Sequence, residues 1–194
     1  MPKHHHYLLN KPHSTLSQFT NQHQTRRNKK MLGPLHNFAE GTMAIGRLDE
    51  HSEGLLLLTT DGKLSAAISS AKVEKEYYAR VLGRVSDAVV ARLSAGVEIS
   101  LGGGKKHRTK DCLVKRLPED PPFSFPPRRK HQASHGPATW VSITLREGKY
   151  RQIRKMLAGV GHPVIRLVRV RIGELRLGDL GVGEVTEVAE LAVK

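Results

Sequence analysis

Short apolar or alternating segments recur along the chain, and they predict strands rather than long helices. The run 54–60 is apolar without alternation, which predicts a strand buried on both faces. In the segment 164–172, Arg169 and Arg171 are expected on the face opposite the apolar residues. The other predicted strands are 7–10, 42–45, 76–82 and 140–145.

Three segments carry the apolar face or the end signals of short helices. The first begins near the capping residue Asp61. The second runs from the capping residue Ser86 to a terminating Gly96, and the third has its apolar face within 153–160. Because helices and strands mix without regular β-α-β alternation, we expect an α+β fold with a largely antiparallel sheet. The length of 194 residues fits a single domain spanning 1–194.

Three segments lack any periodic pattern. Residues 17–30 are polar and basic, and we interpret them as a loop whose basic arm, 21–30, faces nucleic acid. Residues 102–104 are three consecutive glycines and predict a flexible break. Residues 118–137 form an insertion rich in Pro and Arg, with no signal for a helix or a strand.

Charge changes this picture of an ordinary α+β domain. The chain has 32 Lys and Arg against 18 Asp and Glu, a net charge of +14. The excess is concentrated in residues 1–40, 102–135 and 146–176, which indicates a surface that binds a polyanion such as RNA. A generally basic surface without a specific partner is the alternative. A membrane role is disfavoured because no basic amphipathic helix with a bulky apolar face stands out.

The sequence also bears on the cellular compartment. No apolar run approaches the roughly 20 residues that cross a bilayer, and no secretory signal precedes residue 10. The single Cys112 fits a reducing compartment. We therefore expect a cytoplasmic protein, or an organellar or nuclear one if the source is eukaryotic.

Asp49 lies in an acidic stretch of this basic chain, directly before the predicted buried strand. From spacing alone three interpretations stay open. Asp49 is a loop residue paired with Arg47, or it forms a metal site with His51 and Glu53, or it forms a hydrolytic pair of carboxylates with Glu53. A carboxylate beside arginines stays ionised, as a nucleophile or an electrostatic stabiliser requires.

The segment 46–62, GRLDEHSEGLLLLTTDG, resembles the central motif of the pseudouridine synthases that modify ribosomal RNA. Residues 16–20 and the Pro-rich insertion resemble the E-type large-subunit enzymes within that branch. Ser52 stands where the family usually has Thr, and we expect no S4-like RNA-binding domain. Further motifs of the family match, in order, at 10–12, 75–77 and 147–167.

The resemblance implies an isomerase with two subdomains around a central cleft and no cofactor or metal. It assigns catalysis to Asp49, which would stabilise or attack C1′ of a uridine flipped out of its stack. Tyr77 would stack on that base, and Arg154 would pair with Asp49. Arg47 would hold the flipped nucleotide or its phosphate, and Lys11 would support the wall of the site or contact RNA. Tyr78, on the other face of its strand, is expected in the core.

The expected partner is large-subunit ribosomal RNA or its precursor, bound by a monomer. A non-catalytic RNA-binding or ribosome-assembly factor with the same fold is the alternative, and a metal-dependent nuclease is a more distant one. The side chains expected to contact RNA are Arg26, Arg27, Lys29, Lys30, Arg151 and Lys155.

Overall fold

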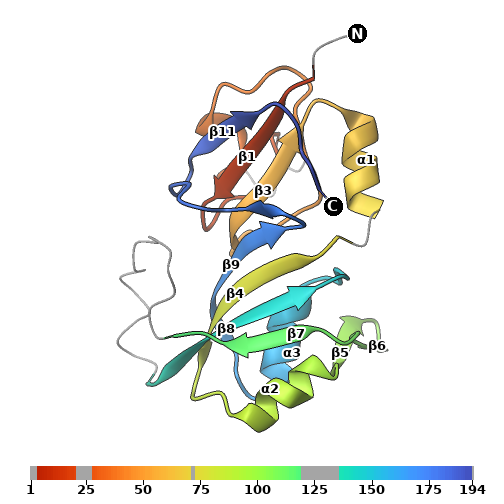
Figure 1. The fold of residues 1–194 in the computed structure, drawn as a ribbon, viewed down its shortest axis with the longest axis vertical. Helices are drawn as coiled ribbons and strands as arrows, with labels where there is room; N and C mark the ends of the chain where they lie inside the picture. Colours follow the sequence, from red (N-terminus) through yellow and green to blue (C-terminus); the bar gives the residue numbers. More distant parts are fainter. Residues whose placement is uncertain (1–3, 21–27, 71–72, 119–135, 194) are drawn as a thin grey trace. The chain divides into compact units, whose positions relative to one another are not determined.

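The computed structural model describes residues 4–20, 28–70, 73–118 and 136–193. The chain divides into two compact units, of which the first comprises Met1–Val73 and Val168–Lys194 and the second Glu74–Leu167 (Figure 1). Most of the Pro-rich insertion and part of the basic arm, including Arg26 and Arg27, lie outside the described residues. The division into two units refines the expected single domain.

The first unit is built around β3 (Glu53–Thr59), whose seven residues are all buried, as the uninterrupted apolar run predicts. The strands of this unit follow the order β11-β1-β3-β9, and the β3–β9 pair is parallel while β1 is antiparallel to both neighbours. Short strands β2 and β10 pair with β3 and β9. The bounds are β1 His6–Lys11, β2 Met43–Ala44, β9 Val164–Ile172, β10 Leu175–Arg176 and β11 Val185–Val188.

Gly54 permits the close approach of β3 and β9. A Cβ at this position would come within 2.8 Å of the backbone nitrogen of Arg169, closer than real Cβ atoms pack. Its φ of +98° also lies in the region that favours glycine. The glycine of the central motif is thus required by the packing of the strand that follows the Asp49 loop.

Helix α1 (Gly62–Ser70) follows β3 in the first unit. Asp61 caps it as expected, because its Oδ1 accepts hydrogen bonds from the backbone N–H groups of Lys63 and Leu64 at 2.9 and 3.1 Å. Ile68 is buried, whereas Ala67 is exposed, so the apolar face is narrower than predicted. A short 3-10 turn, Gly33–Leu35, lies in the loop before β2.

The second unit places strands in the order β4-β8-β7, all antiparallel, against helices α2 and α3. Their buried side chains form one hydrophobic core with contributions from every one of these elements. Ser86 caps α2 through its Oγ, and Gly96 follows the helix at φ +81°, both as predicted. The bounds are β4 Lys75–Leu82, α2 Asp87–Ser94, β7 Leu113–Arg116, β8 Ala138–Leu145 and α3 Gln152–Gly159.

Two sequence expectations for this unit were wrong. The three glycines instead form part of a hairpin, in which Gly102 ends β5 (Glu98–Gly102) and pairs with Lys105 of β6 (Lys105–Arg108), while Gly103 and Gly104 make the turn, and all three have positive φ. Tyr77, rather than Tyr78, shares the face that packs on the core. The register explains the reversal, because Tyr77 lies opposite Ile143 and Tyr78 lies opposite Ser142.

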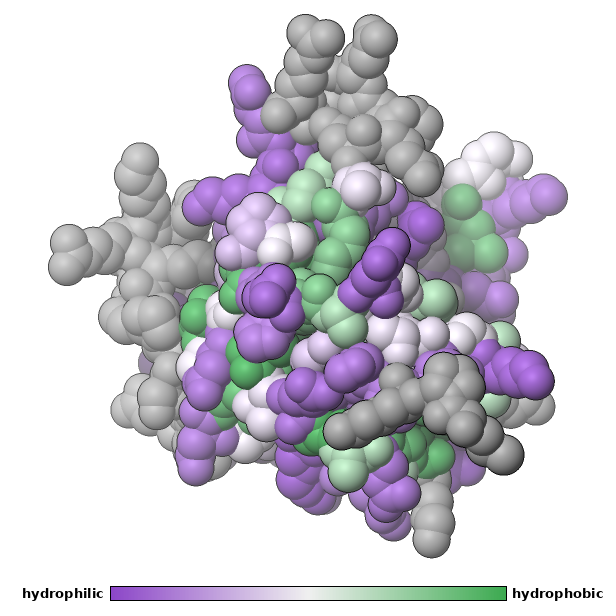
Figure 2. All heavy atoms as spheres, turned by 90° about the horizontal axis from the view of Figure 1, so that it is seen from above, coloured by the Kyte–Doolittle hydropathy of each residue, from purple (hydrophilic) through white to green (hydrophobic). Residues whose placement is uncertain are grey.

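Charged and polar side chains are distributed widely over the surface. They cover much of the face drawn in Figure 2 and separate its smaller hydrophobic areas. None of the helices in the described segments is long and apolar enough to span a membrane.

Candidate active site

The loop 46–52 leads into β3 and carries Asp49 in the first unit. Asp49 is half-buried and Arg47 is exposed. The backbone N–H of Ser52 donates to the carbonyl of Asp49 at 3.0 Å, which closes a turn around the carboxylate-bearing residue. Gly46, at φ +67°, lets the chain leave β2 and enter this loop.

Ser17 fixes the residue before Asp49. Its Oγ donates to the carbonyl of Leu48 at 2.9 Å and accepts from the backbone N–H of Leu48 at 3.0 Å. Ser17 and Leu48 are both buried, so water competes little for these bonds. Ser17 lies both in the segment 16–20 that resembles the E-type enzymes and at the start of the predicted loop 17–30, and its contact with the Asp49 loop has no signal in the hydropathy pattern.

Lys11 ties the end of β1 to the same loop. Its side chain is fully buried, and its Nζ donates to the backbone carbonyls of Pro12 at 2.9 Å, Thr15 at 2.6 Å and Glu50 at 3.4 Å. A side chain so enclosed has no surface for RNA in this structure. Of the two roles expected for Lys11, only support of the site's wall fits this geometry.

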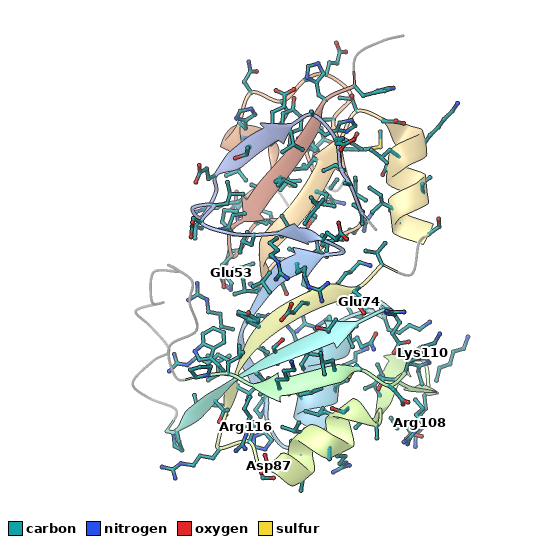
Figure 3. All side chains as sticks on the ribbon, in the orientation of Figure 1. Glu53, Glu74, Asp87, Arg108, Lys110 and Arg116 are labelled. Atoms are coloured by element: carbon teal, nitrogen blue, oxygen red, sulfur yellow. The ribbon has the colours of Figure 1, made fainter. Side chains whose placement is uncertain are left out.

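Burial lowers the pKa of Lys11 to about 8, because removing the ammonium from water disfavours its charged form. The carboxylate of Glu53 opposes this shift, the cation of Arg169 adds to it, and Asp49 and Glu50 oppose it more weakly. Glu53, at the start of β3, is itself buried (Figure 3). The Asp49 loop thus rests on a cluster of buried and half-buried charges.

Arg169 is the second buried cation of this cluster. The predicted strand places it on the face opposite Val168 and Val170, and that side chain is only 3% exposed, with its Nε donating to the carbonyl of Leu55 at 2.7 Å. Alternation along the strand identifies the face but does not say whether that face meets solvent. Here both faces of β9 are covered at this point, since the neighbouring residues Val168 and Arg169 are both buried.

Of the basic arm, Lys29 and Lys30 are described. Lys29 Nζ forms an ion pair with Glu50 Oε1 at 2.7 Å, and this bond lowers the pKa of the Glu50 carboxyl. Lys30 is exposed, and its carbonyl accepts from the backbone N–H of Leu16. One end of the arm is therefore anchored beside the Asp49 loop.

The metal-site interpretation of Asp49, His51 and Glu53 finds no geometric support. In the described segments, no group of three or more His, Cys, Asp or Glu side chains is arranged to hold a metal ion. The His51 ring instead stacks on that of His13, with centroids 4.9 Å apart and planes at 29°.

The second unit holds the other predicted site residues. Tyr77 is half-buried at the margin of the core, and Arg154 Nη1 donates to the carbonyl of Val164 at 3.5 Å. Arg151 precedes α3 at φ +52°, an uncommon conformation for a residue other than glycine. Lys155 Nζ donates to the carbonyl of Ser100 at 2.7 Å. Convergence of Tyr77 and Arg154 with Asp49 on one site stays a prediction.

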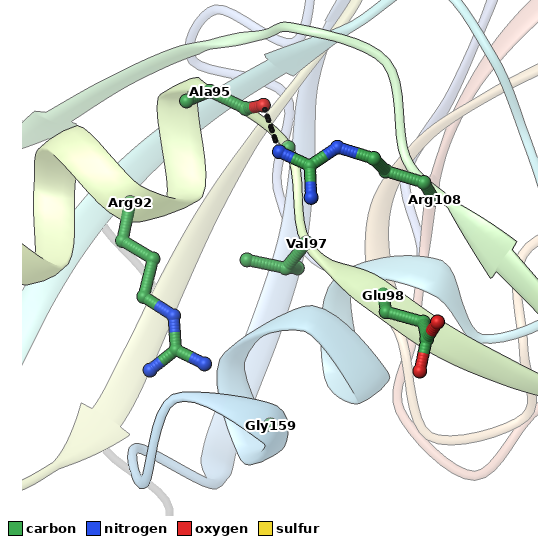
Figure 4. Close-up of a pocket in the computed structure, with 7 residues that line it drawn as sticks. Arg92, Ala95, Val97, Glu98, Arg108 and Gly159 are labelled. Atoms are coloured by element: carbon green, nitrogen blue, oxygen red, sulfur yellow. Dashed lines mark hydrogen bonds between the residues drawn. The ribbon is translucent and has the colours of Figure 1, made fainter.

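A pocket of about 440 Å³ in the second unit contains none of the predicted site residues (Figure 4). It lies where α2 and α3 end, and Arg108 donates to the carbonyl of Ala95 at 3.2 Å. Helix C-termini carry partial negative charge, so Arg92 and Arg108 serve there to offset it. The carboxylate that lines this pocket, Glu98, forms an ion pair with Lys106 Nζ at 2.8 Å.

Comparison with known proteins identifies the family. Residues 5–159 match the family described as RNA pseudouridylate synthase. The ribosomal large subunit pseudouridine synthase E of Vibrio vulnificus (strain CMCP6) is 38% identical over 186 residues, covering 94% of this chain and 74% of the relative. The enzyme of the same name from Xanthomonas axonopodis pv. citri (strain 306) is 37% identical over 177 residues, covering 89% and 88%.

A solved structure agrees with this at the level of the fold. The crystal structure of a pseudouridylate synthase superposes with a TM-score of 0.76 at 24% identity, covering 97% of this chain and 71% of that one. The α+β fold with a mixed, mainly antiparallel sheet is thereby confirmed. From the sequence match over most of its length, the chain belongs to the RNA pseudouridylate synthase family.

Proposed function

We propose that this enzyme isomerises uridine to pseudouridine in large-subunit ribosomal RNA, with Asp49 as its catalytic residue. Pseudouridine synthases are isomerases, and the two relatives described above are named for the large ribosomal subunit. The observation that carries the proposal is the anchoring of the Asp49 loop. Ser17 and Lys11 bond to the backbone of this loop, and Gly54 allows close packing of the strand that follows it.

The proposed reaction requires a carboxylate held in a fixed position and no oxidant, reductant or other co-reactant. The C1′–N1 bond breaks, the base turns, and a C1′–C5 bond forms, while C5 loses a proton and N1 gains one. No electrons enter or leave, so the balance requires no oxidant or reductant. The sugar gains positive character as the base departs, and the Asp49 carboxylate would stabilise C1′ or attack it. A preorganised loop avoids the cost of moving that charge during the reaction.

The other residues would act around the extruded nucleotide. Tyr77 would stack on the detached uracil, and Arg154 would pair with the Asp49 carboxylate and orient it. Arg47, which is exposed two residues before Asp49, would hold the nucleotide or its phosphate. Lys11 would act only through the loop that it supports. The exposed cations of both units would bind the phosphates of the flanking RNA.

We further propose that the enzyme acts as a monomer in the cytoplasm. The single Cys112 supports a reducing compartment. Burial raises the pKa of its thiol to about 11, so it stays in the unreactive protonated form at neutral pH. Size-exclusion chromatography with light scattering would test the oligomeric state directly.

The Asp49→Asn variant tests the catalytic assignment. It keeps the size of the side chain but removes the charge that the reaction needs, so we expect folding and RNA binding to persist and turnover to vanish. Release of tritium from ribosomal RNA that carries 5-tritiated uridine measures turnover. Asp179→Asn, the same change at an exposed position of the first unit, is the control and should leave turnover unchanged.

Two results would contradict the proposal. Appreciable tritium release by the Asp49→Asn variant would remove Asp49 from catalysis. A wild-type protein that binds ribosomal RNA tightly but releases no tritium would favour the non-catalytic assembly factor instead.

A further inference from the structure

Tyr150 is the most exposed large hydrophobic side chain in the described part of the chain. Its exposed fraction is 72%, compared with 55% for Leu113 and 43% for Val182. It lies in the turn that precedes α3, within the second unit. An aromatic ring exposed to this extent contributes little burial to folding and is accessible to a ligand.

The ring is held in place although it is exposed. Lys155 Nζ lies 5.2 Å from the centroid of the ring, a cation–π distance, and the same Nζ donates to the carbonyl of Ser100 in β5 at 2.7 Å. Lys155 therefore connects Tyr150, α3 and the β5–β6 hairpin. Because the ammonium occupies one face of a ring that is 72% exposed, the opposite face meets mainly solvent.

The turn below the ring is fixed by Glu147. Its Oε1 accepts from Gln152 Nε2 at 2.7 Å and from the backbone N–H of Lys110 at 2.9 Å, and its Oε2 pairs with His107 Nε2 at 3.1 Å. These bonds lower the pKa of the Glu147 carboxyl against the opposing effect of burial. The turn, the start of α3 and the hairpin thus form one connected structure.

Cationic residues are frequent in the β5–β6 hairpin and in the turn before α3. The segment 98–110 carries four Lys or Arg residues against one acidic residue, and the segment 146–155 carries five against one. Lys105, at the hairpin turn, is exposed to solvent, and Arg108 and Lys110 lie on the hairpin side of the second unit (Figure 3). A rigid aromatic face surrounded by exposed cations matches what single-stranded RNA needs, a stacking partner for a base and partners for its phosphates.

We propose that Tyr150 is a stacking platform for an unpaired base of the substrate RNA outside the target uridine, with the cations of the β5–β6 hairpin on the adjoining phosphates. The substrate class rests on the proposed function, but the surface itself does not depend on Asp49. Because Lys155 and Glu147 hold the ring before RNA arrives, little conformational entropy is lost when a base stacks on it. Duplex RNA, whose bases are already stacked, gains nothing from the ring.

Binding of single-stranded oligouridine to the Tyr150→Ala variant tests this surface without requiring turnover. Loss of the stack should weaken binding by roughly 5- to 150-fold, while Tyr150→Phe, which keeps the ring, should bind within about twofold of wild type. Leu113→Ala, which truncates another exposed apolar side chain of the same unit, is the matched control and should bind like wild type. Binding of a fully paired RNA duplex should be the same in all four proteins.

The Tyr150→Trp variant gives a direct signal of stacking. The introduced indole should lose fluorescence when oligouridine saturates the protein but not when heparin, a polyanion without bases, does so, and Trp140 in the wild-type protein supplies the background. Wild-type affinity of Tyr150→Ala for oligouridine, or quenching by heparin equal to that by RNA, would overturn the inference. A wild-type protein that binds oligouridine through Tyr150 but forms no pseudouridine would defeat the proposed function and leave this surface intact.

Discussion

The charges around Asp49 are arranged by side chains that hydropathy does not reveal. The motif in residues 46–62 identifies Asp49 because its residue types recur in fixed order. Lys11 and Arg169 are different, because a lysine or an arginine in a short strand is ordinarily expected in water. Their burial depends on carbonyls brought near by tertiary structure, from Thr15 and Leu55. At this scale the sequence identified Asp49 as the candidate catalytic residue, but it did not predict that Lys11 and Arg169 are buried or which carbonyls they contact.

Replacing Lys11 by Met tests the support that it gives. Three carbonyls would lose their shared donor while the volume stays nearly filled, so we expect the free energy of unfolding to fall by about 1–3 kcal/mol at neutral pH. Turnover should fall as well, through a lower kcat, because the loop that carries Asp49 loses an anchor. Urea unfolding and tritium release measure the two effects.

The difference in stability between the wild type and Lys11→Met is expected to depend on pH. The pKa of Lys11 is about 8 in the folded protein and has its ordinary value of 10.5 in the unfolded chain. Between these values the unfolded chain binds more protons, so stability rises with pH. The stability of the wild type relative to Lys11→Met should therefore grow above pH 8, by at most about 1.4 kcal/mol per pH unit. A difference that stays constant, or shrinks, between pH 8 and 10 would contradict burial as the dominant influence on Lys11.

At the scale of elements, helices and strands were predicted correctly where the local sequence pattern is strong. The buried strand β3 and the capped helix α2 were predicted because an apolar run and the pair Ser86 and Gly96 act locally. The hairpin of β5 and β6 was missed because its strands are short, mostly exposed and rich in lysine, with only Ile99 buried in the pair. Its pairing is fixed by the glycine turn and by the contacts of Glu147, which lie far along the sequence.

Gly54→Ala tests whether close packing of β3 on β9 is required. The new Cβ would overlap the backbone of Arg169 at a positive φ, so we expect the free energy of unfolding to fall by about 2 kcal/mol or more. Gly62→Ala is the control, because a Cβ there meets nothing within 4 Å and the position lies in helix α1. That change should raise the free energy of unfolding by about 0.5–1 kcal/mol. Equal effects of the two substitutions in urea unfolding would disprove the packing argument.

At the scale of the whole molecule, composition predicted the kind of partner but not the division of the chain. The excess of cations pointed to RNA, and family membership agrees with it. The family resemblance implies two subdomains, but the sequence does not place their boundaries, because residues 168–194 return to the first unit after the second is complete. No composition shift marks that return, which occurs inside the continuous strand β9. Domain boundaries are usually placed at linkers, and β9 passes from the second unit into the first without one.

The net charge of +14 predicts how RNA binding responds to salt. For a single strand, the binding constant falls with a slope of about −0.7 per phosphate neutralised, so seven contacts would lower it roughly 10³-fold between 50 and 200 mM salt. The exposed Lys105 should supply one such contact, and Lys105→Gln should make the slope shallower by about 0.7. Tyr150→Ala should reduce affinity equally at every salt concentration, because a stacked base displaces no counterion. Titrations of oligouridine at several KCl concentrations separate these effects, and a shallower slope for Tyr150→Ala would mean that the ring acts through the neighbouring cations rather than by stacking.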